Sequence, residues 1–288
     1  MSFFSKLPLD IRFLFLPYLM QFQNVLENPQ TAFSTLTDLM IVSIATQKGG
    51  AGKTTTSIAL SAGLARKGKK VLLVDIDQQA NSSKVLLRHY PTITKEQSVH
   101  ATIIERKPLP IHKTDVPNLD IVPGHILLSN TDVELTIAKD RREDRLKREL
   151  DKVKDNYEYV FIDCPPNLGW LTINALNSSD QVIIIVAPGY FELDSIVQFY
   201  KTIAEVQEFF NPDLQLKGIL FTRSDPTVNT RESLTILRQM YGKELLPVII
   251  PENTDLRNAH FNKQDIFAYN PHAKGAVAYD KLINELFL

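Results

Sequence analysis

The sequence predicts an α/β protein built on a single doubly wound, mostly parallel twisted sheet with helices on both faces. From residue 40 onward, apolar runs rich in Val, Ile and Leu alternate with longer segments of helical periodicity. The apolar runs are nearly continuous, as expected of strands that are buried on both faces of a parallel sheet. Alternation of strands and helices also implies right-handed crossovers, which place helices on both sides of the sheet.

The predicted strands are residues 41–46, 71–75, 119–122, 159–163, 182–187, 216–222 and 248–250, and the predicted helices are 57–67, 139–154, 196–210 and 276–286. The segment 139–154 places Leu146, Leu150 and Val153 at helical spacing within a charged run. Acidic residues are interleaved with its Lys and Arg residues, so a solvated, salt-bridged face is favoured there over a nucleic-acid-binding patch.

Charge and cysteine content exclude several classes of protein. The 288 residues include 32 Lys and Arg against 33 Asp and Glu, for a net charge of -1. This balance argues against a constitutively basic nucleic-acid binder, so any polyanion binding requires a local patch. The single cysteine, Cys164, excludes a disulfide framework and a self-contained four-cysteine metal or iron–sulfur site, and it fits a reducing cytoplasm. No run approaches the roughly 18 apolar residues of a membrane span.

Residues 1–39 stand apart from the strand–helix pattern. They are rich in Phe and Leu but are broken by prolines. Asp10 and Arg12 interrupt the apolar run and no small-residue cleavage site follows, which argues against a signal peptide. Two interpretations stay open: an N-terminal extension that binds a partner, or a wrongly assigned start codon with Met40 as the true start. Residues 40–288 are predicted to form one domain.

The first predicted strand runs directly into a glycine-rich loop, which is followed by a helix. The loop consists of Lys48, Gly49, Gly50, Ala51, Gly52, Lys53, Thr54 and Thr55. Glycines allow the backbone amides to turn inward, where they and the helix N-terminus bind a β-phosphate. Lys53 is expected to reach the β- and γ-phosphates, and the Thr54 hydroxyl to bind Mg²⁺. Strand, loop, Lys-Thr and helix together predict a nucleotide-binding P-loop rather than a glycine-rich turn without a ligand.

The loop departs from the general P-loop pattern at its start. Gln47 stands where that pattern has glycine, and Lys48 adds a second lysine. The ordinary P-loop does not need this lysine to bind its own nucleotide. Lys48 therefore suggests a charge that is supplied in trans to the nucleotide of another subunit.

Carboxylates follow two of the predicted strands at the edge where the loop lies. Asp75 and Asp77 end one strand and Asp163 ends another. In an open parallel sheet, ligands bind outside the carboxyl ends of the strands, so these segments are expected to share one crevice. Asp163 is the predicted outer-sphere partner of Mg²⁺, and Asp77 is a candidate to position the attacking water. For Asp75, a helix cap is an equally good interpretation.

These motifs resemble the ParA/MinD group of deviant-Walker-A ATPases. The resemblance rests on residues 48–56, 71–79, 161–169 and 172–176, and it continues through 248–253 to 274–279. It covers nearly everything from Met40 to the end of the chain, and this order of motifs is highly specific. The sequence is most similar to short ParA-type partition proteins, which lack an N-terminal DNA-reading domain.

The resemblance implies an ATPase that uses ATP and Mg²⁺ and is weak without its partner. Two ATP-bound copies would form a sandwich homodimer, in which Lys48 of each subunit contacts the other subunit's nucleotide. The dimer would bind the DNA of the nucleoid without sequence preference. A ParB-like or other cargo-adaptor protein would stimulate hydrolysis, so that a plasmid, a chromosome or a protein assembly such as a carboxysome is partitioned or positioned. The implied location is the cytoplasm, with nucleoid association in the ATP-bound state.

The family's functional residues carry over by position. Lys48, Lys53 and the switch aspartate Asp77 are the implied catalytic residues, and Asp163 is the Walker B residue. Thr54, Asp77 and Asp163 are the candidate Mg²⁺ site, Gly169 falls in the second switch, and Thr222, Pro251 and Asn253 would lie near the adenine. Gln78 replaces the proline that usually follows the switch aspartate, which implies a less rigid loop.

A DNA-binding face is predicted around one helix and the C-terminal part of the chain. The candidates are Arg231, Arg238, Lys243 and Arg257, with Lys263 nearby. Arg238 matches a DNA-contacting arginine of the family by position, whereas Asp255 stands among the family's basic positions. Each phosphate contact contributes a salt slope of about -0.9, so dimerisation doubles the salt sensitivity and makes a weak patch usable. For any single residue, an ordinary solvated charge stays an equal alternative.

Three other classes share the scaffold. A MinD-like membrane-cycling regulator of division needs a C-terminal amphipathic helix with a basic face, whereas Lys281 here stands beside Asp280 and Glu285. No stable membrane association is therefore expected. A nitrogenase-reductase-like electron carrier is excluded by the lone Cys164. A biosynthetic ATP-dependent synthetase stays open, although Lys48 and the two switch loops favour the dimeric switch.

Overall fold

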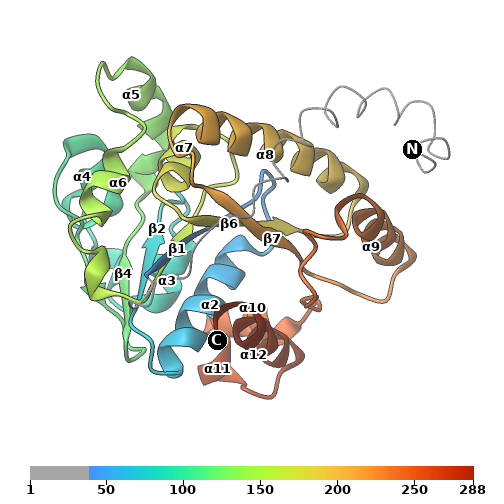
Figure 1. Ribbon diagram of the computed structural model, residues 1–288. Helices are drawn as coiled ribbons and strands as arrows, with labels where there is room; N and C mark the ends of the chain where they lie inside the picture. Colours follow the sequence, from blue (N-terminus) through green and yellow to red (C-terminus); the bar gives the residue numbers. More distant parts are fainter. Residues whose placement is uncertain (1–38) are drawn as a thin grey trace. The chain divides into compact units, whose positions relative to one another are not determined.

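The computed structural model describes residues 39–288, which form a seven-stranded sheet in the order β3-β4-β2-β5-β1-β6-β7 (Figure 1). The strands are β1 Met40–Ala45, β2 Val71–Asp75, β3 His112–Lys113, β4 Leu119–Val122, β5 Tyr159–Asp163, β6 Gln181–Val186 and β7 Gln215–Phe221. All pair in parallel except β3, which pairs antiparallel with β4 at one edge. The predicted fold class is confirmed. The predicted extension 1–39 lies outside the described residues apart from Leu39.

Helices cover both faces of the sheet (Figure 1). One face carries α2 Lys53–Arg66, α3 Asn81–Leu86, α10 Thr254–Phe261, α11 Ile266–Tyr269 and α12 Lys274–Phe287. The other carries α4 Val99–Glu105, α5 Thr131–Ile137, α6 Arg145–Leu150, α7 Trp170–Asn177, α8 Tyr190–Phe209 and α9 Val228–Tyr241. Each face has its own apolar core, and central strand residues such as Leu72 and Leu73 point alternately into one or the other. This two-sided burial explains the continuous apolar runs of the sequence.

Two predicted elements, the strand 248–250 and the helix 139–154, differ from the structure, and one strand was not predicted. The predicted strand 248–250 is not part of the sheet. Instead the chain follows β7 through two isolated parallel bridges, at Leu245 and Pro251, and the Ile250 amide donates to the Phe221 carbonyl at 2.9 Å. Proline at 247 and 251 removes the amides that a regular ladder would need. The short edge strand β3 was not predicted, because two residues carry no periodic signal.

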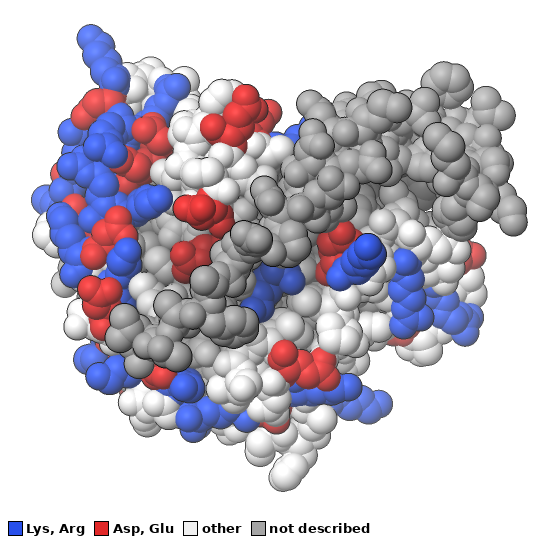
Figure 2. All heavy atoms as spheres, viewed as in Figure 1, with Lys and Arg blue, Asp and Glu red and all other residues white. Residues whose placement is uncertain are grey.

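The predicted helix 139–154 contains only α6 and a 3₁₀ turn, Lys154–Asn156. Asn174 of α7 explains where α6 begins, since its side chain accepts from the Leu146 amide and donates to the Arg142 carbonyl. Arg141 also has φ of 37°, which a right-handed helix does not allow. Lys152 pairs with Glu149 and Lys154 with Asp151, as the interleaved charges predicted. Figure 2 shows this mixture of basic and acidic side chains over the region of α4 and α6.

Candidate nucleotide-binding site

The glycine-rich loop joins β1 to α2 at the carboxyl edge of the sheet. Gly50 and Gly52 adopt left-handed conformations, with φ of 78° and 96°, and Gly52 is the N-cap of α2. An L side chain is strained at such angles, which explains glycine at both positions. Lys53, the first residue of α2, is only 6% exposed. The sequence therefore folds into the strand–loop–helix unit that was predicted, with its lysine at the helix start.

The end of β7 supports this loop from outside. The Thr222 hydroxyl donates to the Ala51 carbonyl at 2.6 Å, and Nη1 of Arg223 donates to the Gly50 carbonyl at 2.9 Å. Thr222 is 1% exposed, so it lies behind the loop. The adenine contact predicted for Thr222 stays a prediction. Arg223 was not among the predicted site residues, and its only signal was its position directly after a predicted strand.

Asp163 lies fully buried at the end of β5, beside the loop. Its Oδ1 accepts from the Ser57 hydroxyl at 3.1 Å and its Oδ2 from the Ser82 hydroxyl at 2.7 Å. Burial raises the pKa of Asp163 to about 6, against the lowering effects of the Ser82 hydrogen bond and the Lys53 charge. A hydrogen bond from Thr54 also lowers this pKa, so Thr54 and Asp163, two of the three predicted magnesium residues, are neighbours. The predicted convergence of the loop and the β5 carboxylate is observed.

Asp75 and Asp77 have different roles. β2 and β5 pair in register, with Asp75 opposite Asp163. Asp75 is fully buried, and its Oδ2 accepts from both the amide (2.9 Å) and the hydroxyl (2.7 Å) of Ser83 at the start of α3. Burial, followed by the nearby charge of Asp163, raises the pKa of Asp75 to about 8. Of the two interpretations left open for Asp75, these contacts favour the helix cap.

Asp77 lies on the loop between β2 and α3 and is 6% exposed. Its Oδ1 accepts from the Gln79 amide at 2.9 Å, and its carbonyl accepts from the Ala80 amide. Its charge acts on both Asp75 and Asp163. Asp77 thus lies close enough to Asp75 and Asp163 to affect both carboxyl groups, although Gln78 stands where a proline would stiffen the loop.

The residues beside the phosphate loop suit Mg²⁺ bound together with a nucleotide. Among residues 39–288, no group of three His, Cys, Asp or Glu side chains could hold a metal by itself. Mg²⁺ is usually bound by one or two protein oxygens together with phosphates and waters. Thr54 offers such an oxygen next to the phosphate loop, Asp163 would act through a coordinated water as the predicted outer-sphere partner, and the nucleotide would complete the coordination.

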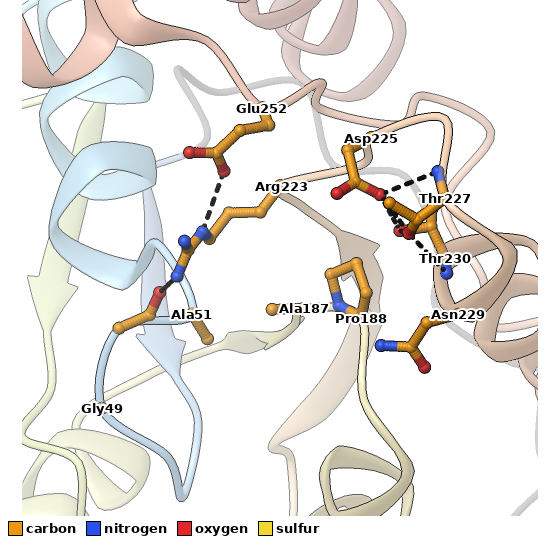
Figure 3. Close-up of a pocket in the computed structure, with 11 residues that line it drawn as sticks. Gly49, Ala51, Ala187, Pro188, Arg223, Asp225, Thr227, Asn229, Thr230 and Glu252 are labelled. Carbon is orange, nitrogen blue, oxygen red and sulfur yellow. Dashed lines mark hydrogen bonds and ion pairs between the residues drawn. The ribbon is translucent and has the colours of Figure 1, made fainter.

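A pocket of about 390 Å³ opens beside the loop, on the side of Gly49 and Gly50. It is lined further by Ala51, Ala187, Pro188, Arg223, Asp225, Thr227, Asn229, Thr230 and Glu252 (Figure 3). Glu252 lies between Pro251 and Asn253, the two predicted adenine residues. The Asn253 Oδ1 is buried without a hydrogen-bond partner in the described part of the chain, so an acceptor is available at this end. The predicted site residues did not include Asp225 and Asn229, which stand in no motif, or Glu252, which lies in the motif segment 248–253 but was given no role.

The predicted DNA-binding candidates lie on the C-terminal elements. Arg231 and Arg238 are exposed on α9, seven residues apart and so on one face of the helix. Lys243 follows α9, and Arg257 is exposed on α10, 3.8 Å from Glu252. Figure 2 shows basic side chains over the region of α9. The structure thus provides a local basic face on a chain with a net charge of -1.

The fold, the loop and the carboxylates define a P-loop nucleoside triphosphatase. The AAA domain family matches residues 39–216. The sporulation initiation inhibitor protein Soj of Bacillus subtilis is 40% identical over 85% of this chain and 97% of its own. The chromosome partitioning protein ParA of Myxococcus xanthus is 36% identical over 85% of this chain and 87% of its own.

Solved structures of nucleotide-bound proteins share this fold. Cobyrinic acid a,c-diamide synthase of Mycobacterium smegmatis, with a bound ATP analog and magnesium, superposes with a TM-score of 0.71 at 31% identity, over 85% of this chain and 93% of the other. The septum site-determining protein MinD of Pyrococcus horikoshii, complexed with Mg-ADP, gives a TM-score of 0.71 at 26% identity, over 86% and 96%.

The chain belongs to the ParA/MinD family of P-loop ATPases, and ATP and Mg²⁺ are its cofactors. Its similarity to Soj and to ParA supports a ParA-like role. In the described part of the chain, no helix is long and apolar enough to cross a membrane.

Proposed function

We propose that this chain is a ParA-like partitioning ATPase that works as a dimeric switch. ATP joins two copies into a sandwich homodimer, the dimer binds DNA without sequence preference, and a ParB-like or other adaptor stimulates hydrolysis and releases it. The observation that carries the proposal is the loop itself, in which Lys48 precedes the helix start where Lys53 and Thr54 lie beside Asp163. A single subunit already holds its phosphates with Lys53, so Lys48 can serve the partner's nucleotide.

Hydrolysis within such a dimer is mainly a matter of positioning. Mg²⁺, held near Thr54 and Asp163, would neutralise charge on the phosphates when it is bound. Lys53, at the positive end of α2, holds the same phosphates, while Asp163 orients the Thr54 hydroxyl. Asp77, on the neighbouring loop, directs the attacking water. Lys48 of the second subunit adds positive charge only when both copies are present, which ties hydrolysis to the dimer.

DNA binding follows from the same dimerisation. A monomer presents the basic face of α9, Arg231 and Arg238, on an otherwise neutral chain. Two copies double the number of phosphate contacts, and the logarithm of affinity scales with that number. We therefore assign DNA binding to the ATP-bound dimer. The corresponding location is the cytoplasm, with the ATP-bound dimer associated with the nucleoid.

The C-terminal helix argues against a MinD-like membrane cycle. The apolar face of α12 is buried against the domain, with Ala276, Tyr279, Leu282 and Ile283 no more than 1% exposed. The Tyr279 hydroxyl also bonds to Thr56 of α2 at 2.9 Å. A helix whose apolar face is packed in the core has none left to insert in a bilayer.

DNA retention on a filter tests the proposal. The wild type and Asp77→Ala are each measured with ATP, with ADP and without nucleotide. We expect retention of the wild type only with ATP, and prolonged retention of Asp77→Ala because its dimer does not hydrolyse ATP. Equal retention in all three nucleotide states would overturn the switch. Normal ATP hydrolysis by Asp77→Ala would overturn the role of Asp77.

A further inference from the structure

Two consecutive residues at the end of β7 hold two consecutive carbonyls of the phosphate loop. Thr222 donates to the Ala51 carbonyl at 2.6 Å, and Arg223 donates to the Gly50 carbonyl at 2.9 Å (Figure 3 shows the second bond). These residues are 171 and 173 positions away from the loop in sequence. Thr222 and Arg223 are not among the groups proposed to contact phosphate, so these two hydrogen bonds need a separate explanation.

Peptide geometry converts these bonds into an effect on the opposite side of the loop. In a trans peptide, the carbonyl of one residue and the amide of the next point in opposite directions, and the described residues have no cis peptide. A donor on the Gly50 carbonyl therefore fixes the direction of the Ala51 amide. A donor on the Ala51 carbonyl fixes the Gly52 amide in the same way.

The amides of Ala51 and Gly52 belong to the part of the loop that binds phosphate. Gly50 and Gly52 adopt left-handed conformations, and successive amides in such turns form anion-binding concavities. Hydrogen bonding of a peptide carbonyl also polarises that peptide and strengthens its amide as a donor. The two bonds from β7 therefore both aim and strengthen the phosphate-binding amides.

The Arg223 side chain is itself held in position. Its Nε donates to Glu252 Oε2 at 2.9 Å, which fixes the plane of the guanidinium so that Nη1 faces the loop. Its backbone has φ of 54°, an uncommon angle for a residue other than glycine. The neighbouring amides of Thr222 and Ser224 bond to the Val186 and Ile250 carbonyls, which stabilises this conformation. A strained backbone maintained by its surroundings is typical of functional sites.

We propose that Thr222 and Arg223 are positioning residues for phosphate binding, which act by holding the carbonyls of Gly50 and Ala51. This inference rests on the ATPase function described above. It assigns the effect of Arg223 to the loop, although Arg223 also lines the pocket beside the loop and could instead contact a base there. Glu252 then links the loop to the segment of Pro251 and Asn253.

Binding of a ligand that has phosphates but no base separates these two roles. We would measure the affinities for Mg-ADP and Mg-pyrophosphate by calorimetry in the wild type, Arg223→Lys, Thr222→Val and Thr222→Ser. We expect Arg223→Lys and Thr222→Val each to lose about five- to tenfold in affinity for both ligands, the value of one hydrogen bond. Thr222→Ser retains the hydroxyl and is expected to bind both ligands like the wild type. Arg88→Lys is the control, because Arg88 is exposed and forms an ion pair with the equally exposed surface residue Asp115.

The outcomes are distinguishable. Loss of Mg-ADP affinity with unchanged Mg-pyrophosphate affinity in Arg223→Lys would overturn the inference and assign Arg223 to the base. Unchanged affinity for both ligands in Arg223→Lys and Thr222→Val would also overturn it. A wild type that binds neither ligand would overturn the proposed ATPase itself. Arg223→Gln, checked by thermal unfolding, replaces the lysine variant should that variant not fold.

Discussion

The Ser82 hydroxyl donates a 2.7 Å hydrogen bond to Oδ2 of the fully buried Asp163. Ser82 lies in α3, directly after the loop that carries Asp77, whereas Asp163 ends β5. The bond therefore joins the segment of the proposed catalytic aspartate to the predicted Walker B carboxylate. It also satisfies an oxygen that has no access to water.

Removal of the Ser82 hydroxyl should weaken the binding of Mg²⁺ that supports ATP hydrolysis. Ser82→Ala leaves one oxygen of a buried carboxylate without its donor, and hydrogen bonds to charged groups contribute about 1.5–3 kcal/mol. We expect ATP hydrolysis to fall about tenfold and the Mg²⁺ concentration for half-maximal activity to rise. The measurement is a Mg²⁺ titration of ATP hydrolysis.

Ser61→Ala is the matched control for Ser82→Ala. Ser61 is also a buried helical serine, but its hydroxyl has no partner among residues 39–288. Its removal is expected to leave the Mg²⁺ titration unchanged. If both variants gave the same titration as the wild type, the Ser82 bond would have no role in the site.

Substitution should separate the roles of the two lysines of the loop, Lys48 and Lys53. Lys53 is buried at the start of α2, whereas Lys48 is partly exposed at the head of the loop. We expect Lys53→Ala to lose nucleotide binding and to reduce hydrolysis about 100-fold or more. Lys48→Ala should bind ADP nearly as well as the wild type but should fail to hydrolyse ATP or to dimerise with it.

Calorimetry with ADP and light scattering with a non-hydrolysable ATP analog measure these two properties. Lys84→Ala is a suitable control, since this lysine bonds to the Gln79 carbonyl on the exposed surface of α3. An ATP-dependent dimer of Lys48→Ala would contradict the role in trans. Normal ADP binding by Lys53→Ala would contradict the phosphate assignment.

The phosphate site could be predicted from the sequence because its parts are local or strand-terminal. Lys53 and Thr54 follow the loop within one short segment, and Asp163 ends an apolar run whose parallel pairing brings it to the same edge. The support from Arg223 and Glu252 could not be predicted. These residues come from separate segments that meet only through the path of residues 245–251 along β7. No periodicity or motif encodes that path.

Helical periodicity was a weaker guide where other elements decide the conformation. Residues 139–154 have the spacing of one helix, yet Asn174 of α7 binds the backbone of Arg142 and Leu146 and sets the start of α6. Such a contact between distant segments overrides local propensity. The pattern of charges was a better guide, because the ion pairs at Glu149 and Asp151 lie between near neighbours in sequence.

Close packing of α2 on α12 should make Gly63 intolerant of a side chain. A Cβ at Gly63 would lie 2.3 Å from Cδ1 of Ile283 and 3.0 Å from Cε2 of Phe267. Overpacking of a core typically costs about 1–3 kcal/mol, so Gly63→Ala should lower the free energy of unfolding by about that amount. Urea denaturation measures this change.

A double-mutant cycle checks that the clash is the cause. Ile283→Val removes the methyl group that meets the new Cβ and should by itself cost about 1 kcal/mol. The double variant Gly63→Ala/Ile283→Val is expected to lose less stability than the sum of the two single variants. An additive result would mean that the clash with Ile283 is not what destabilises Gly63→Ala.

His260 should make stability depend on pH. It lies in the last turn of α10, and burial lowers its pKa from the ordinary value of 6.5 to about 4. Between these values the unfolded chain binds a proton that the folded chain does not. This contribution to stability is therefore complete above pH 6.5 and is lost as the pH falls towards 4. The shift corresponds to at most about 3 kcal/mol.

His260→Gln removes this titration. We expect the free energy of unfolding of the wild type to fall by up to about 3 kcal/mol more than that of His260→Gln when the pH is lowered from about 7 to about 4. The difference between the two proteins isolates His260 from the carboxylates that titrate in the same range. His272→Gln, at an exposed position, should follow the wild type. If His260→Gln followed the wild type as well, the folded protein would protonate His260 as readily as the unfolded chain does, and its burial would have no effect on stability.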